Sequence, residues 1–460
     1  MKAYVIGQPI SHSLSPNIFR ILAEVERSTL SYAAVEVTPT ELSDYVANLR
    51  DDEDFVGSNV TIPHKEAILS LVDDVTPDAL AIGAANVIQA TPRRLKAHNT
   101  DIIGIERTFS KQGFSPKDKV ALLLGAGGSA RAMAYSLAKS GARTIFIYNP
   151  RSPRGTELCA YLQKQFQEVR FLSLQYLEPS HIAPLDLVVN CTPIGMKGEG
   201  TEFYEGLKSL TFQTSALAFD LLYTPKHLPF LKVASSIGLE NINGLNMLIE
   251  QALATWEIWI GRLKHGDELR IRLKSALEAI LKSRENPKPI YLTGFMGVGK
   301  STVARELSYA LNRNFLDTDR LIEEKAHATI SEIFETQGEA KFRLLESAAL
   351  RSTHTSKNHV IALGGGALND PNIINGILEH GTLIYLKATE QTLYRRLRNR
   401  AHQRPLLEGL HDDALKEKIA DLLKKRLPQY AQAQLHVEIK AEDTPFDTAQ
   451  MVLKAWSNSR

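Results

Sequence analysis

Apolar and polar positions alternate in two distinct ways along this chain. Short apolar runs predict strands at residues 3–6, 32–37, 57–61, 119–124, 144–148, 185–190, 217–220, 289–293, 360–363 and 382–386. Segments whose apolar residues recur every three or four positions predict helices at 39–49, 65–71, 129–140, 267–282 and 301–311. This alternation indicates an α/β fold with mostly parallel sheets covered by helices. Two series precede residue 283, which predicts two lobes with a cleft between them, and a third series follows.

A polar segment with two prolines divides the chain. Pro287 and Pro289 would end the amphipathic helix before them and favour an extended connector, so we expect a linker at 284–289. The expected domains are a first lobe of residues 1–103 completed by 239–283, a second lobe of 104–238, and a separate domain of 290–460.

Composition and charge exclude several classes of protein. The chain has 54 basic and 52 acidic residues, so it lacks the basic excess typical of nucleic-acid binding. Its two cysteines, Cys159 and Cys191, argue against a disulfide framework and fit a reducing cytosol. No apolar run reaches the roughly 18 residues of a membrane span, and the first residues predict a strand instead of a signal peptide. We therefore expect a cytoplasmic protein without a membrane partner.

The second series opens with a glycine-rich turn between a buried strand and a helix. Residues 125–130 fit the pattern G-x-G-x-x-A, in which glycines allow a tight turn and a close approach to a pyrophosphate. The expected cofactor-binding residues here are Gly125, Ala126, Gly127, Gly128, Ser129 and Ala130. The pattern in this context predicts a Rossmann dinucleotide-binding lobe.

The end of the next strand bears on the choice between NAD and NADP. It ends at Asn149 instead of an acidic residue, which would bind the ribose hydroxyl and repel a 2′-phosphate. Arg151 and Arg154 follow, and they favour NADP(H).

Three polar clusters follow strand-like or small-residue runs. They are residues 11–16, residues 58–65, and Asn86 together with 99–101. Open α/β sheets bind ligands at the carboxyl ends of their strands. The hydroxyl and amide groups suit a polyhydroxy substrate, and Lys65 and Asp101 suit the movement of a proton.

Taken in order, these motifs closely resemble the shikimate dehydrogenase family over roughly residues 1–280. The resemblance rests on residues 7–16, 59–65, 83–86, 99–101 and 243–251. It implies that Lys65, paired with Asp101, is the acid/base group beside the carbonyl that receives hydride. It implies substrate contacts by Ser13, Ser15, Thr61, Asn86, Asp101, Tyr223 and Gln251. It implies NADP contacts by Asn149, Arg151, Arg154, Thr192, Met196 and Gly244.

One loop departs from the pattern of that family. The family commonly has Asn-Arg-Thr after the cofactor strand, whereas here Pro150 separates Asn149 from Arg151. The first arginine is thus displaced by one position, which keeps NAD open as an alternative.

The third series carries a second nucleotide motif. Residues 294–301 fit the phosphate-loop pattern G-x-x-x-x-G-K-[ST] after a strand-like run. Backbone N–H groups of such a loop surround phosphates, Lys300 reaches the terminal ones, and Ser301 binds Mg²⁺. The expected ATP-binding residues are Gly297, Val298, Gly299, Lys300, Ser301 and Thr302.

Further elements of this series resemble the shikimate kinase family over roughly residues 289–455. They are the carboxylates Asp317 and Asp319, residues 338–346, the glycine run 364–366, and residues 404–407 and 425–430. By this resemblance Asp319 accepts the hydroxyl proton and Asp317 supports Mg²⁺ through water. The resemblance also implies shikimate contacts by Asp319, Arg343, Gly365 and Arg426, an ATP lid that contains Arg404, and a position near the nucleotide base for Arg396.

The two resemblances predict one bifunctional enzyme, because the product of the first activity is the substrate of the second. The expected reactions convert 3-dehydroshikimate and NADPH to shikimate, and then shikimate and ATP–Mg²⁺ to shikimate 3-phosphate. Two alternatives stay open: a quinate/shikimate dehydrogenase that uses NAD, fused to a small-molecule kinase, and a non-catalytic sensor of shikimate-pathway ligands. Either a monomer or a homodimer is expected.

Overall fold

The computed structural model describes residues 1–10, 13–92, 94–150, 152–196, 200–224, 227–398, 407 and 409–459. The chain forms two compact units, Met1–Leu277 and Glu278–Arg460. Among the residues described, no helix has both the length and the apolar character needed to cross a bilayer.

The first lobe of the first unit is built on a six-stranded sheet. Its strands are β1 (Lys2–Gly7), β2 (Ser31–Glu36), β3 (Phe55–Val60), β4 (Asp74–Val75), β5 (Val87–Thr91) and β6 (Arg94–His98). They lie in the order β2-β1-β3-β5-β6-β4, connected in part by helices α1 (Ser15–Val25), α2 (Leu42–Asn48) and α3 (Pro77–Ile82). β1 is parallel to β2 and β3, whereas β5 is antiparallel to β3 and β6. The sheet of this lobe is therefore mixed.

The second lobe is a doubly wound parallel sheet. Its strands are β7 (Val120–Leu124), β8 (Thr144–Tyr148), β9 (Arg170–Leu174), β10 (Leu185–Asn190), β11 (Phe212–Asp220) and β12 (Glu240–Asn243). Its helices are α4 (Asp101–Lys111), α5 (Gly128–Lys139), α6 (Arg154–Gln163) and α7 (Pro229–Ser236). The order β12-β11-β10-β7-β8-β9 reverses direction between β7 and β10, where such sheets bind dinucleotides. Every residue of β7 and β10 is buried, as expected when helices cover both faces.

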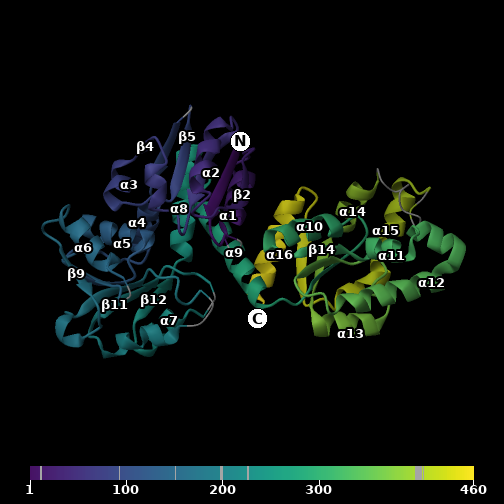
Figure 1. Ribbon diagram of the computed structural model, residues 1–460. Helices are drawn as coiled ribbons and strands as arrows, with labels where there is room; N and C mark the ends of the chain where they lie inside the picture. Colours follow the sequence, from purple (N-terminus) through teal and green to yellow (C-terminus); the bar gives the residue numbers. More distant parts are fainter. Residues whose placement is uncertain are drawn as a thin grey trace. The chain divides into compact units, whose positions relative to one another are not determined.

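The chain returns to the first lobe through α8 (Leu245–Trp259), which packs against α1 and β5 (Figure 1). β12 pairs with β11, so residues 240–243 belong to the second sheet. The crossing between lobes therefore follows Asn243, a few residues beyond the expected boundary at 238.

The second unit is a five-stranded parallel sheet with helices around it. Its strands are β13 (Ile290–Thr293), β14 (Asn314–Asp317), β15 (His359–Ala362), β16 (Thr382–Ala388) and β17 (Leu435–Ile439), in the order β14-β15-β13-β16-β17. Its helices are α10 (Lys300–Leu311), α11 (Thr318–Ala326), α12 (Ile330–Thr353), α13 (Pro371–His380), α14 (Glu390–Leu397), α15 (Asp412–Tyr430) and α16 (Pro445–Asn458). α10 follows the central strand β13 and packs against α16 (Figure 1).

Helix α9 (Gly266–Glu285) contains the division between the units. The helix ends before Pro287, as expected, but the second unit begins at Glu278, ahead of the expected linker at 284–289. The reason lies in the second unit, where the buried guanidinium of Arg313 donates to Ser283 Oγ (2.6 Å) and to the carbonyl oxygens of Asn286 (2.6 Å) and Lys288 (2.6 Å). These contacts make the end of α9 and the following residues part of that fold.

One expected helix, at residues 65–71, is wrong. Only Ala67–Ser70 form a short 3-10 helix, η2. The carbonyl oxygen of Lys65 accepts the N–H of Ala85 (2.8 Å) instead of closing an α-helical turn. Residues 65–66 therefore form a turn after β3, and this turn presents Lys65 to the site described next.

Candidate active sites

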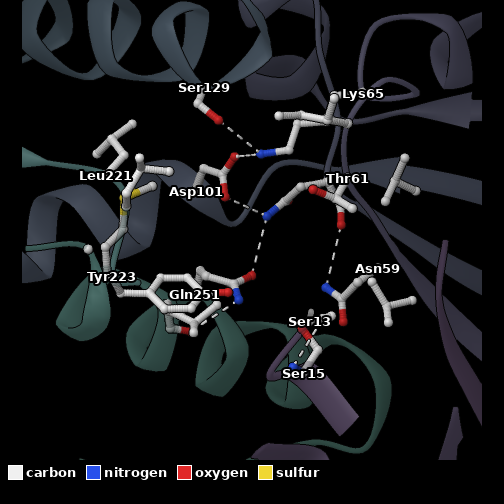
Figure 2. Close-up of a pocket in the computed structure, with 18 of the residues that line it drawn as sticks. Ser13, Ser15, Asn59, Thr61, Lys65, Asp101, Ser129, Leu221, Tyr223 and Gln251 are labelled. Carbon is white, nitrogen blue, oxygen red and sulfur yellow. Dashed lines mark hydrogen bonds and ion pairs between the residues drawn. The ribbon is translucent and has the colours of Figure 1, made fainter. Parts of the chain in front are cut away.

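A pocket of about 250 Å³ lies in the first unit, lined by residues of both lobes. Eight of its lining residues are those expected to act on the substrate: Ser13, Ser15, Thr61, Lys65, Asn86, Asp101, Tyr223 and Gln251. All of these except Asn86 are labelled in Figure 2. Met196 and Gly244, expected near the cofactor, also line it. The pocket therefore unites polar clusters that are up to about 240 residues apart in the sequence.

The charged centre of this pocket is the pair of Lys65 and Asp101. Lys65 Nζ lies 2.5 Å from Asp101 Oδ2, with side chains that are 13% and 7% exposed (Figure 2). Lys65 Nζ also donates to Ser129 Oγ at 3.3 Å, which brings the glycine-rich turn of the second lobe to the same ammonium. Asp101 is the first residue of α4, where a helix N-terminus favours a carboxylate. The structure thus places the ammonium of Lys65, from the first lobe, beside the glycine-rich segment of the second lobe.

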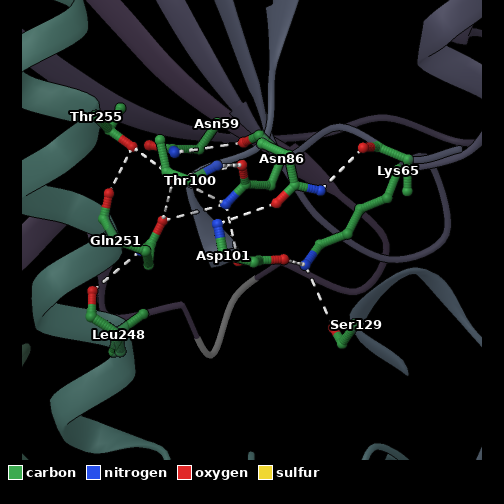
Figure 3. Close-up of polar contacts among 11 residues, drawn as sticks. Asn59, Lys65, Asn86, Thr100, Asp101, Ser129, Leu248, Gln251 and Thr255 are labelled. Carbon is green, nitrogen blue, oxygen red and sulfur yellow. Dashed lines mark hydrogen bonds and ion pairs between the residues drawn. The ribbon is translucent and has the colours of Figure 1, made fainter. Parts of the chain in front are cut away.

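A network of amides and hydroxyls fixes the other oxygen of Asp101 (Figure 3). Asn86 Nδ2 donates to Asp101 Oδ1 at 2.8 Å, and Asn86 Oδ1 accepts the N–H of Thr100 at 2.7 Å. Thr100 Oγ1 lies 3.3 Å from Gln251 Oε1 and 3.1 Å from Thr255 Oγ1, which ties α4 to α8. All five side chains are buried, so their mutual hydrogen bonds leave the carboxylate little freedom to move.

The opposite wall is held by residues that follow β1 and β3. Ser13 Oγ accepts the N–H of Ser15 (3.2 Å) at the start of α1. Asn59, which also lines the pocket, accepts a hydrogen bond from Tyr32 Oη at Oδ1 (2.7 Å). The ring of Tyr32 stacks on Phe19 with centroids 4.3 Å apart, so the amide of Asn59 is positioned by a packed aromatic ring.

The cofactor residues expected in the second lobe lie around the ends of β7, β8 and β10. Gly125–Gly127 form the turn before α5, and Gly128, Ser129 and Ala130 are the first residues of this helix. Thr192 follows β10, where its Oγ1 donates to Asn190 Oδ1 (2.7 Å). Asn149 follows β8, and Arg154 begins α6, where it is paired with Glu66 of the first lobe. The expected contact through Arg151 lies outside the described residues.

A buried carboxylate supports the segment after β10. Burial raises the pKa of Asp220 to about 7, although its Oδ1 accepts hydrogen bonds from Asn190 Nδ2 (2.9 Å) and the N–H of Leu222 (3.0 Å). Because Asn190 also binds Thr192, this carboxyl group helps to fix the chain that leads to Met196.

The phosphate loop of the second unit connects β13 to α10. Lys300 Nζ donates to the carbonyl oxygens of Gly294 (3.0 Å) and Phe295 (3.4 Å), and so crosses the loop it belongs to. Arg396 donates to the carbonyl oxygen of Val298 at 2.9 Å, and thus supports the loop backbone. Gly297, Gly299, Ser301 and Thr302 occupy the loop and the first turn of α10 as expected. The expected lid residue Arg404 lies outside the described residues.

Two carboxylates follow β14 and have distinct environments. Asp317 Oδ1 accepts the N–H of Asp319 at 3.0 Å and caps α11. Burial, and then the charge of Asp317, raise the pKa of Asp319 to about 6, while Lys300 opposes the shift. Asp319 lies against Gly364: a Cβ on that glycine would stand 2.2 Å from Asp319 Oδ1. The glycine run therefore leaves room for the carboxylate that the sequence predicts as proton acceptor.

The two predicted arginines lie against the same glycine run. A Cβ on Gly365 would stand 3.3 Å from Arg426 Nη1, and one on Gly366 would stand 2.5 Å from Arg343 Nη1. Arg343 Nη1 also donates to the buried carboxylate of Glu346 at 2.7 Å. The structure thus gathers Asp319, Gly365, Arg343 and Arg426 from four separate elements.

The residues present fit the expected cofactors. The glycine turn after β7, at the point where the strand order reverses, suits NADP(H). The phosphate loop, Ser301 and Asp317 suit ATP with Mg²⁺. No group of three or more histidine, cysteine or acidic side chains in the described part of the chain could hold a metal ion. Magnesium bound with nucleotides commonly takes one or two carboxylates together with phosphates and water, an arrangement that Asp317 and Ser301 would suit.

Sequence reasoning missed several residues of these sites. Asn59 and Thr100 lie in the same motifs as Thr61 and Asp101, and this proximity in the sequence could have identified them as site residues. Thr255 and Glu346 could have been found from helical spacing, because they follow Gln251 by four residues and Arg343 by three. Glu66 gave no signal, since its partners come from the other lobe.

Comparison with known families confirms both family resemblances. The family model described as the shikimate dehydrogenase substrate binding domain matches residues 5–88. The family model described as shikimate kinase matches residues 296–457.

Known proteins cover the first unit nearly from end to end. The shikimate dehydrogenase (NADP(+)) of Caldicellulosiruptor bescii is 36% identical over 261 residues, which are 56% of this chain and 88% of that protein. The enzyme of the same name from Geobacter metallireducens is 36% identical over 278 residues, or 60% and 96%. The crystal structure of shikimate 5-dehydrogenase from Thermus thermophilus in complex with NADP(H) and shikimate has a TM-score of 0.50 and 29% identity, and it covers 60% of this chain and 98% of that one.

Proposed function

Because this chain belongs to the shikimate dehydrogenase family and carries a shikimate kinase domain after that region, we propose that it performs two consecutive reactions. The first unit reduces 3-dehydroshikimate to shikimate with NADPH. The second unit phosphorylates shikimate with ATP and Mg²⁺ to give shikimate 3-phosphate.

In the reduction, NADPH supplies the hydride to the substrate carbonyl. Negative charge develops on the carbonyl oxygen, and the ammonium of Lys65 stabilises it and delivers the proton. Asp101 Oδ2, 2.5 Å from Lys65 Nζ, holds this ammonium in the pocket. Ser13, Ser15, Thr61, Asn86, Tyr223 and Gln251 hold the substrate through its hydroxyl and carboxylate groups.

In the phosphorylation, the protein mainly positions groups and neutralises charge. Asp319 accepts the proton of the attacking hydroxyl, and Arg343 and Arg426 bind the substrate carboxylate beside Gly365. Lys300 and the backbone of Gly297–Gly299 hold the phosphates, while Ser301 and Asp317 support Mg²⁺.

The observation that carries the proposal is the composition of the pocket in the first unit. Its wall contains all eight side chains expected to act on dehydroshikimate, brought together from both lobes. The glycine run in the second unit, in contact with Asp319, Arg343 and Arg426, supports the second activity in the same way.

The test is a sequential assay of the purified full chain. Dehydroshikimate and NADPH should yield shikimate, and later addition of ATP–Mg²⁺ should convert shikimate to its 3-phosphate. NADH in parallel distinguishes a dehydrogenase that prefers NAD, and quinate tests the alternative substrate. Turnover with neither cofactor would contradict the proposal and favour a sensor.

We propose the lobes 1–103 with 239–283 and 104–238, with their crossing adjusted to follow Asn243, and a kinase domain whose start is moved from the expected 290 to Glu278. A cytoplasmic location, and a monomer or homodimer, complete the proposal.

A further inference from the structure

The turn that carries Lys65 is also the place where the two lobes of the first unit are joined by charge. Next to Lys65, Glu66 forms ion pairs with two arginines of the second lobe. Its Oε2 lies 3.3 Å from Nε of Arg131 in α5, and its Oε1 accepts a hydrogen bond from Nη2 of Arg154 at the start of α6.

The backbone around this cluster is closely packed. A Cβ on Gly128, the first residue of α5, would stand 3.0 Å from Cβ and 3.1 Å from Cδ of Lys65. The aliphatic part of the Lys65 side chain thus packs closely on Gly128, and this places Glu66 beside the first turns of α5 and α6. Glu66 is 34% exposed, so the cluster is open to solvent on one side.

Arg154 has a second expected partner. It begins α6 directly after the loop that follows β8, and the end of this second strand is where a Rossmann fold binds the adenosine ribose. An arginine at this place accommodates the 2′-phosphate that distinguishes NADP from NAD. The carboxylate of Glu66 and a 2′-phosphate would therefore require the same guanidinium.

We propose that Glu66 is a specificity-determining residue that competes with the 2′-phosphate of NADPH for Arg154. This inference rests on the proposed reductase function. When NADPH binds, the phosphate replaces Glu66 at Arg154, and Glu66 keeps Arg131. NADH carries no 2′-phosphate and leaves the Glu66–Arg154 pair intact. Glu66 therefore lowers the affinity for NADPH but not for NADH, and so reduces the difference in affinity between the two cofactors.

The test measures dissociation constants of NADPH and NADH for the full chain, by cofactor fluorescence at fixed ionic strength. Glu66→Gln removes the charge and keeps the size of the side chain. It should tighten NADPH binding by about two- to fivefold, the range expected for one partly exposed ion pair, and leave NADH binding nearly unchanged. Glu66→Asp, which keeps the charge, should stay closer to the parent.

Glu53→Gln is the matched control, because it removes an exposed carboxylate that precedes β3, at the opposite end of that strand from Thr61. It should change neither constant. A second control combines Glu66→Gln with Arg154→Gln, where the gain in NADPH affinity should vanish because the contested guanidinium is gone.

Three outcomes overturn the inference. The first is an equal change in the dissociation constants of both cofactors, which would mean that Glu66 only holds the two lobes together. The second is weaker NADPH binding in Glu66→Gln. The third is a gain in NADPH affinity that persists when Arg154 is also replaced. Thermal unfolding of each variant shows whether it is folded. If Glu66→Gln does not fold, the NADPH and NADH dissociation constants of Glu66→Asp are compared with those of the parent and of a variant that also carries Arg154→Gln. Failure of the parent chain to bind either cofactor would contradict the proposed function instead.

Discussion

The two proposed active sites differ in how their central carboxylate is surrounded: by a cation in the first unit and by another carboxylate in the second. In the first unit Lys65 and Asp101 neutralise each other at 2.5 Å, and buried amides occupy the remaining oxygen of the carboxylate. In the second unit Asp319 is placed near another carboxylate, and burial raises its pKa to about 6. In the proposed mechanism the reductase site therefore holds its proton donor in an ion pair, whereas the kinase site holds a carboxylate of raised pKa that Mg²⁺ and the substrate would approach.

The most severe way to break the first site is to remove its ammonium. Lys65→Met keeps the stem that packs on Gly128, so the turn should stay in place. We expect reductase kcat to fall by about 10²–10⁴-fold, the usual contribution of a positioned proton donor. The kinase rate of the same preparation is the control and should be unchanged. A reductase that keeps its rate would exclude Lys65 as the proton donor.

The second site is more sensitive to its backbone. In Gly364→Ala the new methyl group would stand 2.2 Å from Asp319 Oδ1 and displace the carboxylate. We expect kinase kcat to fall by about 10²-fold, the scale of a misplacement near 1 Å. Reductase activity and the thermal unfolding of the chain should show that the effect is local. An unchanged kinase rate would show that Asp319 moves without consequence.

The pH dependence of the kinase sharpens the comparison further. Because the pKa of Asp319 is raised to about 6, its carboxylate is lost as pH falls through that value. Phosphorylation should therefore decline about tenfold per pH unit below pH 6. Asp319→Asn mimics the protonated form and should show the low-pH rate at all pH values. A rate that stays flat down to pH 5 in folded protein would exclude Asp319 as the base.

The same shift affects stability in the opposite direction. An acid with a raised pKa is favoured in its protonated form by the fold, so its contribution to the free energy of unfolding is present at low pH and is lost as pH rises through about 6.

The smallest expected effect comes from the hydrogen bond that positions Asn59 in the first pocket. Tyr32→Phe removes the hydroxyl that donates to Asn59 Oδ1 but keeps the ring stacked on Phe19. Loss of one such bond costs about 0.5–1.5 kcal/mol, so KM for dehydroshikimate should rise about two- to tenfold with kcat nearly retained. Tyr176→Phe, at a well-exposed position, is the matched control. An unchanged KM would show that Asn59 does not need Tyr32.

Local patterns were enough to predict most of the strands and both glycine-rich turns, whereas the expected substrate residues came from the resemblance to a known family. The apolar run at β7 and the glycines after it depend only on neighbours in the sequence, and they were predicted correctly. The helix expected at 65–71 failed because the carbonyl of Lys65 is taken by Ala85, about twenty residues away. The Glu66 pairs were out of reach for the same physical reason, since no local pattern encodes a contact between lobes.

The grip of Arg313 on the end of α9 decides where the kinase half can be cut from its neighbour. A fragment that starts at Ile290 would retain this buried guanidinium but would lack Ser283 and the carbonyl groups that accept its hydrogen bonds. Such a stranded cation is costly, so a free-standing kinase from this chain has to begin upstream, within the helix itself. A flexible glycine–serine tether at residues 282–288 would keep carbonyl groups but would not hold them in place around Arg313, so it should weaken the same hydrogen bonds; this junction is therefore a structural part of the second unit.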